Sequence, residues 1–461
     1  MAAGAALWPG VAGARTIGRG IADPYIISLP ADQQTATLHE IRSELRAGYV
    51  RFVVSWRDAE PQQGAYDPAS RYMAGVTSAV SQAQADGLKV IITFMYVPKW
   101  ASDKTYWHGP TMNYGYEPYG AMNIKCLTDF RLFCQGVATQ FRNQVYAYEC
   151  WNEPNLWCFL FPQITSRDRN FGAHLYVKML RRCSAGIRAG DPKALVVAGA
   201  TSPRGSSGAS HSSASPLRFA GVIKAAGVSK YFDAYSHHPY MPGGSPRLWP
   251  EAAPRDPKGT VSLQNLGALL KLFPGKPFFL TEYGYQTAAC TAFTGQHVDQ
   301  ITQALYLKRA YAYAARYPQV TLLMWYLLKD YSPQKPTPAA DGFYTGLCTA
   351  NGTRKRAWYA FARGDHLTLT APASITSGAS LTLTGQVSCA SVGGVAGQPL
   401  VVERRTAGSW SAVKTVTSSA GGVYTEPVGD YTVDLRPKAS AYYRITWRGV
   451  VTSPTRYVKV K

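Results

Sequence analysis

Short apolar runs alternate with amphipathic stretches over most of this 461-residue chain, from about Thr16 to Arg363. Runs rich in β-branched and aromatic residues predict buried strands at Thr16–Ile21, Tyr49–Trp56, Lys89–Tyr96, Val145–Glu153, Ala194–Ala200, Tyr231–His238, Pro277–Glu282 and Val320–Leu328. The stretches between them predict helices at Ala31–Ala47, Pro68–Asp86, Asp129–Asn143, Asp168–Ala189, Ser215–Ala226 and Gln296–Tyr317. Apolar strands that alternate with helices form a parallel sheet covered by helices. Eight repeats within roughly 350 residues predict an α/β fold, the (β/α)8 TIM barrel with loop insertions.

A doubly wound open sheet is the alternative architecture. It is disfavoured because no Gly-rich phosphate-binding motif follows the first predicted strand. In a barrel, the carboxyl ends of all strands converge on one face, where the active sites of this fold form. Side chains at the ends of the predicted strands are therefore the candidates for function.

The pattern changes near Asp365. From Leu367 to Lys461, short Thr/Val/Leu runs are separated by Gly and Ser turns, and no helical period is present. About 95 residues of short strands predict a small all-β sandwich of immunoglobulin-like type. Its closing stretch, Tyr442–Trp447, resembles the last strands of bacterial immunoglobulin-like modules appended to secreted enzymes. We predict a signal remnant or disordered tail at 1–15, the barrel at 16–363 and an accessory sandwich at 366–461, which is either a spacer or a sugar-binding module.

Charge and aromatic content narrow the possible partners. The formal net charge of +21 would attract an acidic polymer, although a basic solvated surface without a specific partner explains it equally well. No dense Lys/Arg run or recognition motif indicates nucleic acid, and no apolar stretch in the sequence has the length of a membrane span. The 30 tyrosines and 11 tryptophans offer flat apolar faces with polar edges, which suit sugar rings and protein surfaces.

Eight cysteines at irregular spacing, without a CxxC pair, argue against a zinc site and are consistent with export. We expect Cys126–Cys134 and Cys290–Cys348 as the first pairings to test, and we interpret Cys183, in a helical stretch, as a buried thiol. Residues Met1–Ala14 are rich in Ala and Gly and finish in Ala12-Gly13-Ala14, which resembles a signal-peptidase site. A secreted, extracellular bacterial protein is the resulting prediction.

Two glutamates follow buried apolar runs. Glu153 comes after the run that begins at Val145, where Pro154 is expected to stop the strand because proline cannot donate to a sheet ladder. Glu282 comes after Pro277–Thr281. A pair of carboxylates at one face of a barrel is what hydrolysis of a sugar acetal needs. One carboxylate attacks the anomeric carbon, while the other protonates the leaving oxygen and later deprotonates water.

The runs Trp-Asn-Glu-Pro at 151–154 and Thr-Glu-Tyr-Gly at 281–284 resemble the two glutamate signatures of glycoside hydrolase clan A, most like families 39 and 5. The resemblance covers roughly Thr16 to Arg363. It implies retaining catalysis, with Glu153 as the acid/base and Glu282 as the nucleophile. It also implies substrate-binding roles for Asn152 at the 2-hydroxyl, Arg51 beside the nucleophile, His238 and Tyr240 lining the site, and Trp325 as a floor for the sugar. No metal and no organic cofactor are implied.

Several of these residues have a simpler structural interpretation. For Arg51 the alternative is a structural ion pair, although its place on the second strand favours function. For Trp325, barrel packing is as good an explanation as a sugar platform. His237 and His238 suggest a metal, but adjacent strand residues point to opposite faces and cannot easily bind one ion. Trp100 and Trp157, in aromatic loops after the third and fourth strands, are expected to form walls of the cleft, with loop packing as the alternative.

The leading hypothesis is therefore a secreted retaining glycoside hydrolase that cleaves β-linked glycans in a poly- or oligosaccharide, with an anionic glycan as one candidate substrate. An α-L-arabinofuranosidase on the same scaffold is a competing enzyme. A non-catalytic carbohydrate-binding or adhesion protein is the competing class, and the presence of both glutamates together with Asn152 and Arg51 speaks against it.

Overall fold

The computed structural model describes residues 16–106, 122–205, 213–241, 249–289, 297–331, 342–363, 366–367, 369–388, 399–406, 408–419, 428–447, 451–453 and 455–461, and the account below concerns these. The chain divides into two compact units. One comprises Met1–Gln296 and Ala310–Thr345, and the other His297–Arg309 and Gly346–Lys461. The predicted signal remnant at 1–15 lies outside the described residues.

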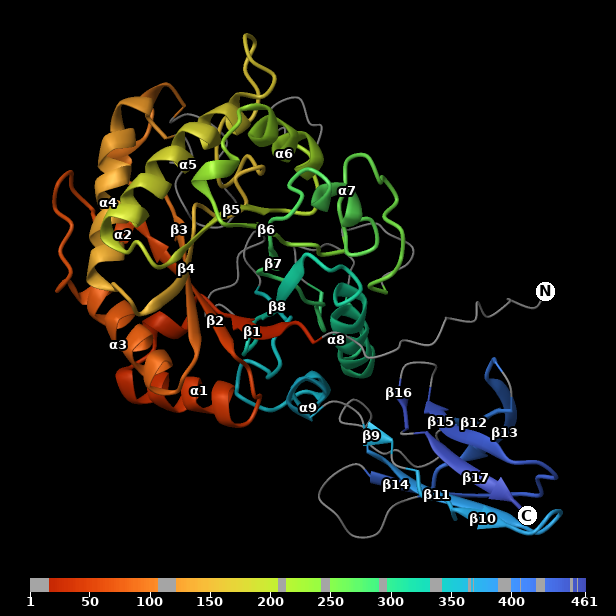
Figure 1. Cartoon of the computed structure of the whole chain (residues 1–461). Coiled ribbons are helices and arrows are strands. Elements are labelled where there is room, and N and C mark those ends of the chain that lie inside the picture. Colours follow the sequence, from red (N-terminus) through yellow and green to blue (C-terminus); the bar gives the residue numbers. More distant parts are fainter. Residues whose placement is uncertain are drawn as a thin grey trace. The chain divides into compact units, whose positions relative to one another are not determined.

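Eight parallel strands close into a barrel in the first unit (Figure 1). They are β1 (Gly18–Ala22), β2 (Tyr49–Ser55), β3 (Lys89–Met95), β4 (Val145–Glu149), β5 (Leu195–Thr201), β6 (Ala234–His237), β7 (Phe278–Leu280) and β8 (Val320–Tyr326). Each strand pairs with the next, and β8 returns to β1 with Gly18 opposite Leu322 and Ala22 opposite Tyr326. The prediction of a (β/α)8 barrel is confirmed.

In the first unit, helices lie outside the strands (Figure 1). They are α1 (Ala31–Ser43), α2 (Trp56–Ala59), α3 (Arg71–Ala85), α4 (Leu127–Gln140), α5 (Phe171–Gly190), α6 (Pro216–Ala225) and α7 (Gly267–Leu270). The helix α8 (Gln300–Ala314) has residues in both units, and α9 (Arg356–Arg363) belongs to the second. All six predicted helices form, each somewhat shorter than predicted. Serine caps fix the starts of two of them: the Ser70 side chain accepts from Met73 N, and Ser215 accepts from Arg218 N. Within the described part of the chain, each helix is too short or too polar to cross a bilayer.

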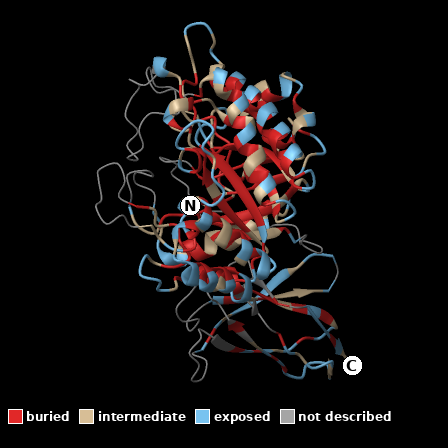
Figure 2. Cartoon of the chain, turned by 90° about the vertical axis from the view of Figure 1, so that its left-hand side faces the viewer, coloured by how far each residue is buried: buried red, intermediate tan, exposed pale blue. Residues whose placement is uncertain are grey.

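Apolar side chains fill the inside of the barrel. Seven of the eight strands contribute to one buried cluster, made of Ala22, Ile91, Ala147, Val197, Ala234, Phe279, Leu322 and Met324. The strands are buried along most of their length (Figure 2), as expected of a sheet covered by helices. The packed interior leaves the carboxyl ends of the strands as the place where polar side chains can gather.

The C-terminal strands form two separate sheets. They are β9 (His366–Leu367), β10 (Ser374–Ile375), β11 (Leu381–Ser388), β12 (Pro399–Arg405), β13 (Ser411–Thr417), β14 (Val428–Leu435), β15 (Ala441–Trp447), β16 (Val451–Thr452) and β17 (Arg456–Val460). One sheet has the order β10-β17-β15-β12-β13, with β16 beside β15, and the other has the order β14-β11-β9. Both sheets contribute to one apolar core, with Leu383 and Val433 from the second sheet and Val402 and Ile445 from the first. The all-β character is confirmed, and the immunoglobulin-like relationship stays a prediction.

Candidate active site

The turn after β4 positions Glu153. The strand ends at Glu149, four residues earlier than the sequence suggested, so the prediction that it runs to Glu153 is wrong. Trp151 and Glu153 have φ of 88° and 40°, in the left-handed region that a strand cannot contain. The Glu153 backbone N–H donates to Ala200 O of β5 at 2.9 Å, which holds the turn against the next strand. Such backbone strain is typical of functional sites.

Glu282 lies two residues beyond β7, with its carboxylate between two donors. Arg51 Nη1 donates to Oε1 at 2.7 Å, and the Tyr240 hydroxyl donates to Oε2 at 3.1 Å. Burial raises the pKa of Tyr240 well above its usual value, and the Glu282 charge adds to this. The hydroxyl therefore keeps its proton and stays a donor to Glu282.

Arg51, in β2, is buried to 2% exposure and donates to three acceptors. Besides Glu282 it binds Glu149, from Nε to Oε2 at 2.7 Å, and Asn152, from Nη2 to Oδ1 at 2.7 Å. Burial disfavours its charge, but the carboxylates of Glu149 and Glu282 outweigh burial and raise the Arg51 pKa. The guanidinium is therefore a permanent cation that positions the predicted sugar-binding Asn152 and the carboxylate of Glu282 together.

Glu149 is a third carboxylate of the site that the sequence analysis missed. It is fully buried and accepts from the hydroxyls of Thr93, at 2.6 Å, and Thr281, at 2.7 Å, as well as from Arg51. Burial tends to raise its pKa, but the Arg51 charge and the hydroxyl donors lower it below its usual value. An acid at the end of an otherwise apolar strand was the available signal, since glutamate is almost never fully buried unless paired.

His238 follows β6 and faces Glu153. Its Nδ1 lies 2.9 Å from Glu153 Oε1, and its Nε2 lies 3.1 Å from Thr281 Oγ1. His237 points elsewhere, to Thr201 Oγ1 and Val261 O, so the two histidines do take opposite faces. Burial lowers the pKa of His238 well below its usual value, and the Arg51 charge lowers it further, so the ring is neutral.

The two glutamates differ in protonation. Burial raises the pKa of Glu153 well above its usual value, and the Glu282 charge raises it further. Burial also raises the pKa of Glu282, but Arg51 and the Tyr240 hydrogen bond oppose that rise. Of the two groups, Glu153 is the one that keeps a proton, and Glu282 is the one stabilised as a carboxylate.

Glu153, His238 and Glu282 each have one atom that could serve as a metal ligand, and these three atoms lie within 4.8 Å of one another. Such a group could bind a metal cation. The Arg51 guanidinium already occupies Oε1 of Glu282, however, and its charge disfavours a second cation beside it. The three residues are therefore candidates for proton transfer and bond making.

The predicted tryptophans take different positions. Trp325, in β8, has no exposed surface, its Nε1 donates to Thr345 O at 2.8 Å, and its ring packs edge-on against Tyr283. Trp100 is half-buried and its Nε1 donates to Glu60 O at 3.0 Å. Trp157 is half-buried in the loop after β4. The sugar contacts expected of these three residues stay predictions.

The cysteine pairing differs from the expectation. Cys150, next to Glu149, forms a disulfide with Cys183 of α5, with Cα atoms 6.0 Å apart. Cys126 and Cys134 are both unpaired thiols, so the expected bridge between them is wrong. Eight residues of helix separate them by about 12 Å, beyond the reach of a disulfide. The expected partner of Cys348, Cys290, lies outside the described residues.

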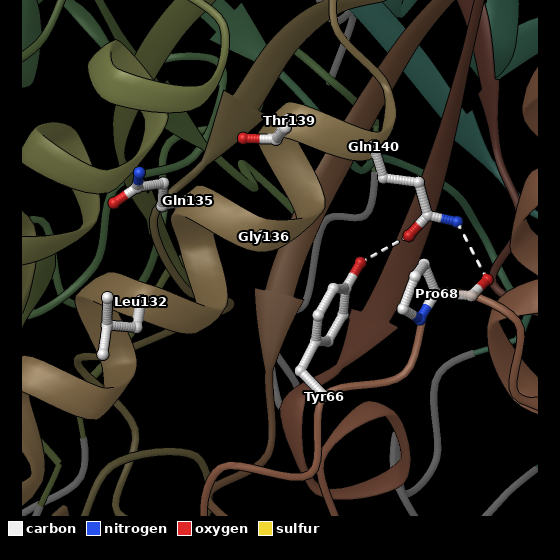
Figure 3. A pocket seen from close by; sticks show the side chains of 7 residues that line it. All are labelled: Tyr66, Pro68, Leu132, Gln135, Gly136, Thr139 and Gln140. Carbon is white, nitrogen blue, oxygen red and sulfur yellow. Dashed lines mark hydrogen bonds between the residues drawn. The ribbon is translucent and has the colours of Figure 1, made fainter.

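A hollow of about 430 Å³ lies against α4, away from this cluster (Figure 3). Its lining consists of Tyr66, Pro68, Leu132, Gln135, Gly136, Thr139 and Gln140. The Tyr66 hydroxyl donates to Gln140, whose amide donates to Pro68 O at 3.2 Å. The lining offers no carboxylate, imidazole or thiol, and we assign no chemistry to it.

Known proteins share this architecture. No curated protein sequence matches the chain significantly. Among solved structures, a family 39 glycoside hydrolase from Bacteroides cellulosilyticus WH2 has a TM-score of 0.54 at 17% identity, covering 94% of this chain and 81% of that one. GH5_18 from Streptomyces cattleya, solved in complex with Manb1-4GlcNAc, has a TM-score of 0.55 at 15% identity, covering 75% and 79%. GH5_18 from Bifidobacterium longum subsp. infantis has a TM-score of 0.52 at 15% identity, covering 76% and 78%.

At these identities the similarity shows a shared fold. The family assignment comes from the sequence itself, because the model of the cellulase family, glycosyl hydrolase family 5, matches residues 21–327. That segment spans the barrel from the end of β1 to the end of β8 and contains both glutamates, Arg51 and His238. The chain is therefore a glycoside hydrolase and belongs to glycosyl hydrolase family 5.

Proposed function

We propose that the protein hydrolyses β-linked glycosidic bonds with retention of anomeric configuration, by a double displacement. The short separation of the acids is the observation that carries this proposal. One carboxylate oxygen of Glu153 lies within 4.8 Å of one carboxylate oxygen of Glu282. Retaining enzymes have carboxyl groups about 5–5.5 Å apart, whereas inverting enzymes need about 6.5–9.5 Å to admit a water.

The roles of the two acids follow from their surroundings. Glu282, ionised beside Arg51, attacks the anomeric carbon and forms a glycosyl ester, while the bond to the leaving oxygen breaks. Glu153 transfers its proton to that oxygen. In the second step Glu153, now a carboxylate, takes a proton from water as the water oxygen attacks the anomeric carbon. The ester bond breaks, Glu282 returns as a carboxylate, and Glu153 is protonated again.

We infer β-linked sugars as the substrate class from family membership. A β-mannosidic bond is the first to test, because one structural neighbour was solved in complex with Manb1-4GlcNAc. The net charge of +21 would attract an acidic glycan, so such a glycan is also among the substrates to test. Turnover of a polyuronate that falls steeply with added salt would support that substrate, and turnover insensitive to salt would remove it.

We also propose that the enzyme acts outside the reducing cytosol. The Cys150–Cys183 disulfide supports this, since structural disulfides persist in oxidising compartments. We expect to recover the protein from the culture medium of the producing cells, with Cys150 and Cys183 resistant to alkylation because they are joined in the disulfide. Intracellular protein with both thiols alkylated would contradict it.

Glu153→Gln and Glu282→Gln test the mechanism on a panel of aryl β-glycosides, an aryl α-L-arabinofuranoside and soluble polysaccharides. We expect Glu153→Gln to lose on the order of 10²–10⁴-fold in kcat with a poor leaving group, and Glu282→Gln to fall to background. Glu60→Gln is the matched control, because Glu60 is a buried carboxylate that binds Trp56 Nε1 at 2.7 Å outside the cluster. Full activity in either glutamine variant would contradict the assignment.

Azide separates the two roles. With Glu282→Ala, azide displaces the leaving group directly, so the glycosyl azide has inverted configuration. With Glu153→Ala, azide intercepts the glycosyl ester and the product retains its configuration. Release of the sugar as the inverted anomer by the unmodified enzyme, seen by NMR, would contradict retention. Sugar binding without turnover of any substrate would favour the non-catalytic alternative, and preferred cleavage of the arabinofuranoside would favour that enzyme.

A further inference from the structure

A buried chain of hydrogen bonds leads from Glu153 to Glu149. Glu153 Oε1 lies 2.9 Å from His238 Nδ1, and His238 Nε2 lies 3.1 Å from Thr281 Oγ1. The Thr281 hydroxyl in turn lies 2.7 Å from Glu149 Oε1. His238, Thr281 and Glu149 have no exposed surface, so water cannot substitute for any of these partners.

The direction of each hydrogen bond in this chain can be assigned. Glu149 receives the Arg51 Nε–H at 2.7 Å and the Thr93 hydroxyl at 2.6 Å on its other oxygen, as an ionised carboxylate does. An ionised carboxylate only accepts, so the single hydroxyl proton of Thr281 points to Glu149. The Thr281 oxygen then has only lone pairs left for His238.

His238 must therefore donate from Nε2. Since the ring is neutral, its one proton is on Nε2, and Nδ1 carries a lone pair that faces Glu153. A carboxylate in front of that lone pair would meet an acceptor, whereas a protonated Glu153 can donate to it at 2.9 Å. The ring thus distinguishes the two protonation states of the proposed acid/base.

We propose that Thr281, oriented by Glu149, is a positioning residue that holds His238 as its Nε2–H tautomer, so that His238 binds Glu153 only when Glu153 is protonated. This inference rests on the proposed function. In the first step, the hydrogen bond to His238 Nδ1 stabilises the protonated form of Glu153 until the leaving oxygen takes the proton. In the second step the ionised Glu153 faces a lone pair, which strengthens it as the base that deprotonates water.

Other charged and titratable groups, from several elements, also lie near Glu153 and His238. They are Arg51 of β2, Glu149 of β4, Cys158 in the loop after β4, Arg204 after β5, His237 of β6, Tyr240 after β6 and Glu282 after β7. The single hydroxyl of Thr281 forms hydrogen bonds with both His238 and Glu149. Its substitution therefore changes the tautomer constraint while every charge stays in place.

Thr281→Val tests the proposal, because valine keeps the shape and removes the hydroxyl. The His238 proton can then move to Nδ1 and donate to ionised Glu153, which lowers the Glu153 pKa. The alkaline limb of the pH profile of kcat/KM reports the pKa of Glu153 in the free enzyme. We therefore expect this limb to move to lower pH by about one unit or more. Thr281→Ser, which keeps the hydroxyl, should leave the limb in place.

Thr93→Val is the matched control. Thr93 is equally buried and donates to the same carboxylate, but the hydrogen bonds of His238 go to Glu153 and Thr281 and not to Thr93. It should leave the position of the alkaline limb unchanged, whatever it does to stability. Equal shifts in Thr93→Val and Thr281→Val would mean that Glu149 acts through charge alone, and would overturn the tautomer proposal.

Nitrogen-15 NMR of the histidine rings gives a readout that needs no turnover. His238 should have a protonated Nε2 and an unprotonated Nδ1 in the unmodified protein and in Thr281→Ser, and should lose that pattern in Thr281→Val. A protonated Nδ1 in the unmodified protein would overturn the inference. If no glycoside is turned over, the proposed function fails while the NMR result still tests the tautomer. Activity with an unmoved limb in Thr281→Val overturns the inference alone.

Discussion

Arg51 binds Glu282 through a hydrogen bond of 2.7 Å from Nη1 to Oε1, with the arginine side chain 2% and the glutamate side chain 12% exposed. The same guanidinium binds Glu149, which has no exposed surface. One buried cation therefore neutralises two carboxylates, one at the end of β4 and one just beyond β7. Stability and reactivity are coupled at this residue, because removing the cation leaves both charges without compensation.

Arg51→Met should impair both folding and turnover. We expect the free energy of unfolding to fall by about 3–5 kcal/mol, the cost of breaking a buried ion pair from one side. The Glu282 pKa should rise, so the acidic limb of kcat/KM should move to higher pH. Denaturant unfolding and a pH–rate profile measure the two effects. Arg188→Met, which breaks a half-exposed pair with Asp233, is the control and should cost no more than about 1 kcal/mol.

Tyr240→Phe removes one donor from Glu282 and leaves the ring in place. A hydrogen bond to a charged group contributes about 1.5–3 kcal/mol, so kcat/KM should fall by about 10- to 150-fold. The lost donor also raises the Glu282 pKa, which moves the acidic limb to higher pH. Tyr285→Phe is the control, since that hydroxyl binds Tyr283 at 2.8 Å. An unmoved acidic limb in Tyr240→Phe would show that its hydroxyl does not tune Glu282.

Reduction of the Cys150–Cys183 disulfide should destabilise the barrel. The bond closes a loop with a sequence separation of 33, and its loss should lower the free energy of unfolding by about 2–5 kcal/mol. Guanidinium unfolding with and without dithiothreitol measures this without changing side-chain volume. The double variant Cys150→Ala and Cys183→Ala should make stability insensitive to the reductant, whereas Cys126→Ala should keep the sensitivity. Equal midpoints in oxidised and reduced protein would contradict a stabilising bond.

His237 should make the fold sensitive to acid. Burial lowers its pKa to about 4, whereas an unfolded histidine titrates near 6.5. Between these values the unfolded state binds the additional proton, so stability falls as pH drops through this window, by roughly 3 kcal/mol in total. His237→Gln should reduce the dependence between pH 6.5 and 4 in denaturant titrations, and the buried His238, whose pKa is also lowered, should account for part of the dependence that remains. His39→Gln, at an exposed site, should retain it, and identical slopes for both variants would exclude His237 as the cause.

Local pattern accounts for the elements that were predicted correctly. The apolar run from Lys89 and the helical period from Pro68 depend only on neighbours in the chain, so the eight strands and six helices could be recognised from sequence. The short helices α2, α7 and α9 span four to eight residues, too few for a periodic pattern to be distinguished. The end of β4 was misplaced because the left-handed turn at Trp151 and Glu153 has no sequence signal comparable to glycine.

The sequence by itself determined the eightfold alternation and the position of Glu153 and Glu282 in the segments that follow the fourth and seventh strands. Only the tertiary structure decided which groups share a proton or a charge. Glu149 joins the site because parallel strands in a closed barrel bring β2, β4 and β7 to one end, although 132 residues separate Glu149 from Thr281. The disulfide between Cys150 and Cys183 has a different cause: the fold brings α5 beside the turn after β4, with the two Cα atoms 6.0 Å apart. Hydrogen bonds and disulfides depend on distances of a few ångströms, and sequence spacing does not contain those distances.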